Sequence, residues 1–531
     1  MTTADLPAAA SAVDLARDVV QAGVKALVSA PGGAEANQVL AYDLAHAAAA
    51  VEIARALLDY GAKGDVEASI TCAFVADAVA ELATKLYGRE ALWGAEVSAL
   101  DGARDFVATY RDPAFLAELA DAGDGPRHLD ADFELVQDTF RRFADEKLKP
   151  VAEHIHRENT DIPEDIISGL GEMGAFGLSI PEEYGGYSGG GESEYIGMVV
   201  ATEELSRGSL GAGGSLITRP EILTRALLKG GTEDQKNEWL PKLAGAEVLN
   251  AVAVTEPDFG SDVAGVKVTA TKSSEGGRDG WLINGVKTWC TFAARADVLM
   301  LVARTDPDRS KTHRGLSLFI VPKDRGEGHG FELTQDGGGK MEGRAIDTIG
   351  YRGMHSYEVS FDSWFVDDAC LVGGDDGLGK GFYLQMAGFE NGRLQTAARA
   401  VGVMQAAYES ARQYALDRVV FGQPIAEFQL TKAKLARMAI TIQAARQFSY
   451  VVARMMANGH GTLEAAMVKA YVCKAAEWVT REAMQLHGGM GYAEEFAVSR
   501  YFVDARVLSI FEGADETLCL RLIARRLVEQ A

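Results

Sequence analysis

The sequence predicts a mainly helical α+β protein in which one strand-rich region lies between two helical parts. Apolar residues recur at three- and four-residue spacing through most of residues 1–249, which is the period of an amphipathic helix. Residues 250–372 contain short runs rich in Val, Ile, Thr and aromatic residues, separated by Gly, Asp and Asn, as is typical of strands. The helical spacing returns from residue 373 and continues to the end.

Four segments follow from these changes of pattern. Residues 1–128 are rich in Ala and are expected to form a helical N-terminal extension that ends in the polar, Gly- and Pro-containing linker DAGDGPRHLDAD. We expect an N-terminal α-domain at 129–249, a middle β-domain, barrel or sandwich, at 250–372, and a C-terminal four-helix bundle at 373–531.

The extension shows one internal similarity. GDVEASITCAFVADA at 64–78 aligns with GTLEAAMVKAYVCKA at 461–475, and each follows a long amphipathic segment and a Gly-containing turn. The extension is either a degenerate copy of part of the C-terminal bundle, or the two Ala-rich helices match by composition alone.

Charge and cysteine content exclude several classes of protein. A formal net charge of -24 repels nucleic acid and anionic lipid, so neither is an expected partner. The five cysteines have no CxxC spacing, which predicts reduced thiols and no metal site. The N-terminus has the pattern of neither a signal nor a transit peptide, and no stretch reaches about 20 apolar residues. We therefore expect a cytoplasmic protein.

Several motifs occur in order after residue 130. They are AVAVTEPDFGSDVAGVKVTA, INGVKTWCTFAARAD, DRVVFGQPIAEFQLTKAKLARM, QLHGGMGY and IFEGADETLCLRLIARRL. Together they resemble the acyl-CoA dehydrogenase family. The resemblance implies non-covalent FAD, an acyl-CoA substrate, an electron-transferring flavoprotein as electron acceptor, and a homodimer.

The first two motifs are expected to hold the flavin. In T-E-P-x-x-G-S-D, Pro and Gly break a strand and expose backbone amides and hydroxyls in a tight loop. The resemblance implies that Val254 and Thr255 contact the flavin and that Ser261 contacts both FAD and the pantetheine chain. It also places Trp289 beside the isoalloxazine and Thr291 at its N5 edge. The alternative for Trp289 is a half-buried strand aromatic.

The next two motifs are expected to bind the ADP half of FAD. An arginine fork suits a pyrophosphate, and glycines allow the backbone to approach a dinucleotide closely. The resemblance implies that six residues bind here: Arg418, Phe421, Gln429, Gln485, Gly488 and Gly489. Of these, Arg418, Phe421 and Gln429 are expected to reach the FAD of the neighbouring subunit. His487 is expected to pack rather than to bind. For Arg418 the alternative is a solvated helix-surface side chain.

Removal of the weakly acidic α-proton of a thioester needs a base, and a carboxylate in a dry site serves. The family has this Glu at one of two sites, and only the loop Phe511-Glu512-Gly513 carries it here, because the other holds Gly392. Glu512 is therefore the predicted base, the alternative being a Glu that caps a helix N-terminus. The resemblance implies that Gly513, Glu390 and Arg393 contact the substrate. The family's usual Tyr, Thr and Gln are replaced by Phe511, Ala514 and Leu518.

The extension and the tail are similar to those of family members that oxidise (2S)-methylsuccinyl-CoA to mesaconyl-CoA, in the ethylmalonyl-CoA pathway of bacterial acetyl-CoA assimilation. The free carboxylate of this substrate needs a cation or several donors. Arg219, beside Thr218 in SLITRPEIL, is the candidate. Its alternative role is a surface ion pair with Glu221 or Glu183.

Rival functions remain open. One is a dehydrogenase for another short or branched-chain acyl-CoA. A second is an acyl-CoA oxidase, although oxidases add length at the C-terminus. A flavin monooxygenase of the same fold would lack Glu512, and a helical scaffold without FAD would lack the flavin spectrum.

Overall fold

The computed structural model describes residues 3–531. It contains two compact units, one made of Met1–Asp138 with Thr396–Ala531 and the other of Thr139–Gln395. The expected mainly helical α+β fold with a middle sheet is confirmed. The four segment boundaries drawn from the sequence stay a prediction.

The first unit joins the N-terminal extension to the C-terminal helices. Its longer helices are α1 (Leu6–Ser29), α3 (Gln38–Gly61), α4 (Asp65–Leu86), α6 (Arg104–Tyr110), α7 (Pro113–Ala122), α15 (Gln429–Ala457), α16 (Thr462–Leu486) and α18 (Val498–Leu508). The chain ends in α19 (Asp515–Thr517) and α20 (Ala524–Glu529). Helix α14 (Gly381–Asp417) enters this unit at Thr396.

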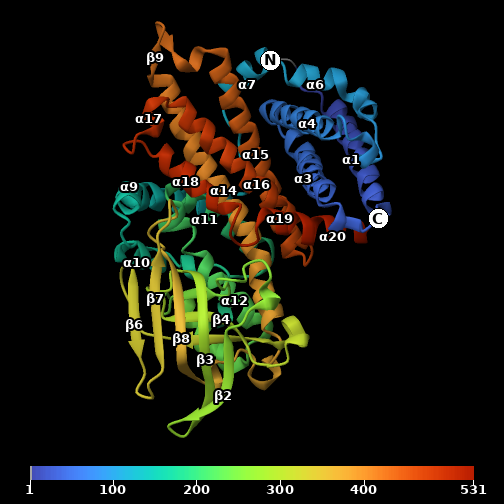
Figure 1. The fold of residues 1–531 in the computed structure, drawn as a ribbon. Coiled ribbons are helices and arrows are strands. Elements are labelled where there is room, and N and C mark those ends of the chain that lie inside the picture. Colours follow the sequence, from blue (N-terminus) through green and yellow to red (C-terminus); the bar gives the residue numbers. More distant parts are fainter. Residues whose placement is uncertain (1–2) are drawn as a thin grey trace. The chain divides into compact units, whose positions relative to one another are not determined.

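Helices α3 and α4 pack against α15 and α16, which Figure 1 shows in blue and orange-red. Residues 44–49 of α3 are buried without interruption, which is more than one full turn of the helix. Each pair forms a hairpin across a Gly-containing turn, as expected for 64–78 and 461–475, but their common origin stays a prediction.

The predicted linker lies on α15. Gln443 Nε2 donates to the carbonyl oxygen of Gly125 at 2.7 Å, and Gln447 Nε2 donates to that of Arg127 at 3.0 Å. These bonds satisfy backbone groups that have no partner in a helix or strand. The chain leaving the extension is therefore fixed to the C-terminal helices.

The second unit contains the helices α8 (Ala131–Phe143), in part, α9 (Lys149–Glu158), α10 (Glu164–Glu172), α11 (Gly191–Gly208), α12 (Thr218–Gly230) and α13 (Glu233–Ala244). Its strands are β1 (Asn250–Ala253), β2 (Thr269–Glu275), β3 (Arg278–Thr291), β4 (Val298–Arg304), β5 (Leu316–Pro322), β6 (Gly330–Thr334), β7 (Lys340–Ile346) and β8 (Ser356–Asp367). Short strands β9 (Val419–Val420) and β10 (Gln423–Pro424) form a hairpin in the first unit.

Strands β1–β8 form one sheet in the order β1-β4-β2-β3-β8-β7-β6, with β5 paired to β4. Strand β4 is buried at every residue and β5 at all but its last, which agrees with their unbroken apolar sequences. Side chains from α12 and α13, including Leu223 and Leu240, complete this core with Met300 and Ile320. Among residues 3–531 no helix combines the length and the apolar composition needed to cross a membrane.

Candidate active site

Glu512 lies in the short loop between α18 and α19. Its φ is +53° and that of Gly513 is +97°, so two successive residues have left-handed backbone. Residues other than glycine rarely adopt a left-handed backbone, and those that do are often found at functional sites. A side chain at Gly513 would be strained, because its φ lies where residues other than glycine are rarely found, and a Cβ there would also lie 2.9 Å from Leu518 Cδ2. The backbone N–H of Asp515 donates to the carbonyl of Ser509 at 3.1 Å and closes the loop.

Two side chains of α14 hold the Glu512 carboxylate. Thr396 Oγ1 donates to Oε2 at 2.8 Å, and Arg399 Nη2 donates to Oε1 at 2.7 Å. The Arg399 side chain is fully buried and that of Glu512 is 6% exposed. Arg399 also lies over the ring of Phe511, 4.9 Å from its centroid. The carboxylate is therefore oriented by two donors and largely shielded from water. The first turn of α19 receives no side-chain cap.

A buried lysine fixes the next residue of the loop. Lys469 Nζ on α16 donates to the carbonyl oxygen of Gly513 at 2.6 Å. Burial lowers the pKa of Lys469, and neighbouring groups including Glu512 partly offset that effect. Thr396, Arg399 and Lys469 were not predicted from the sequence. The available signal was a charged residue inside a buried, Ala-rich helical run, TAARAV for Arg399 and AAMVKAYV for Lys469.

The family's other base position holds Gly392 on α14, one turn before Thr396. Beside it Arg393 is buried and Glu390 is half-buried. Their neighbour Asn391 donates to Glu221 Oε1 at 3.3 Å. No carboxyl occupies position 392, so Glu512 is the one candidate base that these two loci offer.

The T-E-P loop follows β1 and is held by a buried ion pair. Lys287 Nζ lies 2.8 Å from Glu256 Oε1 and donates also to the carbonyl of Val254 at 2.9 Å. Glu256 accepts from the backbone amides of Lys267 and Val268 at 2.6 and 2.8 Å. Val254 is therefore buried inside the loop, while Ser261 lies at its exposed end.

Trp289 is presented at a β-bulge. The register of β3 against β8 shifts between Lys287 and Cys290, and Trp289 has φ +57°. A bulge re-aims the side chain it carries. The indole is 55% exposed, and its place beside a flavin stays a prediction.

Two contacts fix the strand around this indole. The N–H of the preceding Thr288 donates to the carbonyl of Thr255 at 2.8 Å, which brings the first two motifs together. Thr291 is buried, and its hydroxyl bonds that of Ser356 at 2.9 Å.

The residues expected at the ADP half all lie in the first unit and are exposed. Phe421 is 98% exposed on the β9–β10 hairpin, with φ +51°. Arg418 precedes the hairpin, and Gln429 begins α15. Gln485 lies at the end of α16, and a Cβ at Gly488 or Gly489 would meet open space. His487 is buried and stacks on Tyr414 at 4.3 Å between ring centroids, which agrees with a packing role.

Arg219 is a buried cation near the start of α12. It is 7% exposed, and its Nη2 donates to the hydroxyl of Tyr351 at 3.0 Å. Its Nε is buried with no hydrogen-bond partner within the described chain. Glu221 lies instead near Arg225, at 3.5 Å, so the pair of Arg219 with Glu221, given above as an alternative role, is not formed. Burial raises the pKa of Glu221, although Arg225 acts in the opposite direction.

The fold and these motifs agree with what comparison to known proteins shows. Models of the acyl-CoA dehydrogenase N-terminal, middle and C-terminal domains match residues 130–247, 251–364 and 379–528. The chain therefore belongs to the acyl-CoA dehydrogenase family, a family of flavin-dependent oxidoreductases.

Three known proteins are similar to this chain in sequence or in structure. The (2S)-methylsuccinyl-CoA dehydrogenase of Cereibacter sphaeroides is 45% identical over 76% of this chain and 71% of its own length. A glutaryl-CoA dehydrogenase solved with glutaryl-CoA has a TM-score of 0.68 at 31% identity, covering 76% of this chain and 97% of that one. A glutaryl-CoA dehydrogenase of Mycobacterium smegmatis solved with FADH2 has a TM-score of 0.65 at 26% identity, covering 76% and 95%.

Proposed function

We propose that this chain is a FAD-dependent acyl-CoA dehydrogenase that oxidises a short dicarboxylic acyl-CoA, namely (2S)-methylsuccinyl-CoA to mesaconyl-CoA. The observation that carries the chemistry is the Glu512 carboxylate, buried in a left-handed loop and held by Thr396 and Arg399. A carboxylate so fixed is a pre-oriented base.

In this mechanism Glu512 accepts the α-proton of the thioester as the Cα–H bond breaks. The hydride leaves the β-carbon and a Cα–Cβ double bond forms, which balances the two hydrogens removed. Negative charge develops on the thioester oxygen, and the backbone N–H of the Glu512 loop is the donor expected to stabilise it. Bound FAD supplies the acceptor for the hydride.

Several exposed groups support FAD as the cofactor. Trp289 offers a flat apolar face, and Arg418 offers a guanidinium fork for a diphosphate. The open space at Gly488 and Gly489 allows a ligand to approach their backbone. One relative of the same fold was solved with FADH2. Trp289 therefore suits the flavin ring system, Arg418 the diphosphate, and the two glycines the adenosine.

Arg219 supports a dicarboxylic substrate. The buried guanidinium of Arg219 donates to one tyrosine hydroxyl and has a buried Nε without a partner among the described residues, so it has capacity for an anion. A substrate carboxylate bound there would satisfy a charge that is otherwise costly to bury. Similarity to a methylsuccinyl-CoA dehydrogenase and to a glutaryl-CoA dehydrogenase is consistent with this assignment.

We further propose a homodimer that passes electrons to an electron-transferring flavoprotein. Phe421 is almost fully exposed, and an exposed aromatic on a hairpin suits a contact with a second subunit. The oxidase alternative is less well supported, because the additional length precedes the family core. Light scattering tests the dimer, and hydrogen peroxide formation without added flavoprotein would favour the oxidase.

The experiment that tests the proposed function is anaerobic flavin bleaching with a panel of acyl-CoAs. We expect rapid bleaching by (2S)-methylsuccinyl-CoA and slow bleaching by butyryl-CoA, isovaleryl-CoA and glutaryl-CoA. Faster bleaching by a monocarboxylic thioester such as butyryl-CoA or isovaleryl-CoA would assign a different substrate. A protein purified without any flavin spectrum, and unable to bind added FAD, would overturn the proposal.

A further inference from the structure

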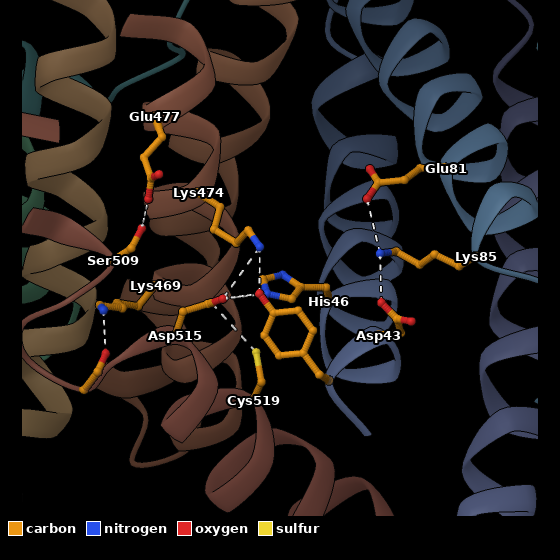
Figure 2. Close-up of polar contacts among 12 residues, drawn as sticks. Asp43, His46, Glu81, Lys85, Lys469, Lys474, Glu477, Ser509, Asp515 and Cys519 are labelled. Atoms are coloured by element: carbon orange, nitrogen blue, oxygen red, sulfur yellow. Dashed lines mark hydrogen bonds and ion pairs between the residues drawn. The ribbon is translucent and has the colours of Figure 1, made fainter. Parts of the chain in front are cut away.

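Two side chains of the N-terminal extension contact the residue that ends the Glu512 loop. Tyr42 Oη donates to Asp515 Oδ2 at 2.5 Å, and His46 Nε2 lies 3.2 Å from the same oxygen. Tyr42 and His46 are one turn apart on α3, with ring centroids 4.8 Å apart. Figure 2 shows His46 turned toward Asp515 from the neighbouring helix. Helix α3 precedes residue 130, where the family model begins.

Asp515 is only three residues from Glu512, and it is buried. Burial acts to raise its pKa, but the hydrogen bonds from His46 and Tyr42 and the charge of Lys474 bring it below the ordinary value. Asp515 is therefore an ionised carboxylate with oriented donors. Its position fixes the first residue of α19 and with it the end of the loop.

Lys474 on α16 completes the cluster. Its Nζ donates to Tyr42 Oη at 2.6 Å and lies 3.8 Å from Asp515 Oδ2. Burial and Asp515 raise the pKa of Tyr42, so its hydroxyl keeps the proton that it donates. The order Lys474, Tyr42, Asp515 is thus a chain of charge-assisted hydrogen bonds, which are stronger than neutral ones.

His46, Asp515 and Cys519 are also residue types that bind zinc, and their ligand atoms lie within 4.8 Å of one another. Hydrogen bonding accounts for the cluster better. Asp515 already accepts from Tyr42, and the ammonium of Lys474 lies where a cation would be repelled. Burial raises the pKa of the Cys519 thiol, so it does not favour the thiolate that a metal needs.

The loop is thus held from three helices of one unit. Helix α14 binds the Glu512 carboxylate through Arg399, α16 binds the Gly513 carbonyl through Lys469, and α3 binds Asp515. We propose that Tyr42 and His46 of the extension are positioning residues, which act through Asp515 to keep the Glu512 carboxylate in the orientation that abstracts the α-proton. This inference rests on the proposed function of Glu512.

The test compares the rate of single-turnover flavin reduction by (2S)-methylsuccinyl-CoA in three FAD-loaded proteins: wild type, Tyr42→Phe and His46→Gln. Misplacing a catalytic group by a fraction of an ångström slows chemistry strongly, so we expect the rate to fall about 10- to 100-fold in each variant. The dissociation constant of the substrate, read from the flavin spectrum, should change less than about twofold, because neither residue is expected to touch it.

Tyr60→Phe is the matched control. Tyr60 also lies on α3, is buried, and donates from its hydroxyl, but to the carbonyl of Pro126 at 3.0 Å. If the contacts merely attach the extension, Tyr42→Phe and Tyr60→Phe should have equal, small effects on the rate. Thermal unfolding of both variants separates a loss of stability from a loss of alignment.

A double-mutant cycle adds a second readout. Since Tyr42 acts through Asp515, adding Tyr42→Phe to Asp515→Asn should change the rate by less than about twofold. Native rates in both Tyr42→Phe and His46→Gln, with Glu512→Gln inactive, would overturn the inference but leave the proposed function intact. A native rate in Glu512→Gln would instead overturn the proposed function. The inference would also be overturned if the purified protein contained equimolar zinc and a chelator removed both the zinc and the activity.

Discussion

Arg399 Nη2 lies 2.7 Å from Glu512 Oε1, and the arginine side chain is fully buried. The predicted base is thus paired with a cation inside the protein. This pairing makes each partner depend on the other. Removing one partner of a buried ion pair leaves the other uncompensated.

Arg399→Gln should therefore destabilise the protein by about 3–5 kcal/mol, the usual cost of breaking a buried pair from one side. Combining it with Glu512→Gln should recover part of this loss, because two amides leave no buried charge. Chemical unfolding of the single and double variants measures the effect. Thr396→Val, which removes one hydroxyl donor, is the milder control at about 1–3 kcal/mol. Equal stability of Arg399→Gln and wild type would show that the pair is not needed for folding.

Arg219→Ala should change substrate selection. If Arg219 binds the free carboxylate, kcat/KM for (2S)-methylsuccinyl-CoA should fall by about 10⁴-fold relative to butyryl-CoA, because a site built for a polar group discriminates on that scale. Steady-state assays with both substrates measure the ratio. A matched control is Arg225→Ala, since Arg225 already has Glu194 and Glu221 as partners. An equal loss on both substrates in Arg219→Ala would remove the carboxylate assignment.

Asp515 should contribute to stability in a defined pH range. Its pKa in the folded protein lies below the ordinary value of 3.8, so the folded state holds fewer protons than the unfolded state in acid. The stabilisation is present above about pH 4 and is lost as the pH falls through the lower, folded value. We expect Asp515→Asn to unfold at a lower temperature than wild type at pH 7, with the difference shrinking below about pH 4. A difference that grows in acid would contradict the assigned direction.

Features that depend on residues close together in the sequence could be predicted, whereas contacts between distant residues could not. The helical and strand periods are local, and the regions they predict are present. The motif around Glu512 is local too, so the base loop was predicted with its glycine. Arg219 was singled out because the free carboxylate of the expected substrate needs a cation, and this arginine lies in the N-terminal α-domain.

The contacts that hold the loop were not predicted, because they join distant parts of the chain. Tyr42 and Asp515 are separated by 473 positions, and Arg399 and Glu512 by 113. No spacing rule connects such residues, and only the packing of α3 and α14 in the folded unit brings them together. Trp289 was expected beside a flavin, but its exposure depends on a bulge in β3 that the strand pattern did not indicate.

The most direct test of the account is the rate of anaerobic flavin reduction in Glu512→Gln with saturating (2S)-methylsuccinyl-CoA. The amide keeps the size of the side chain but is not a base, so the rate should fall by about 10²–10⁴-fold or more while FAD and substrate still bind. Glu516→Gln, at the exposed neighbouring carboxylate, should reduce the flavin at the wild-type rate. Reduction at an unchanged rate in Glu512→Gln would contradict the account, because some other group would then remove the α-proton.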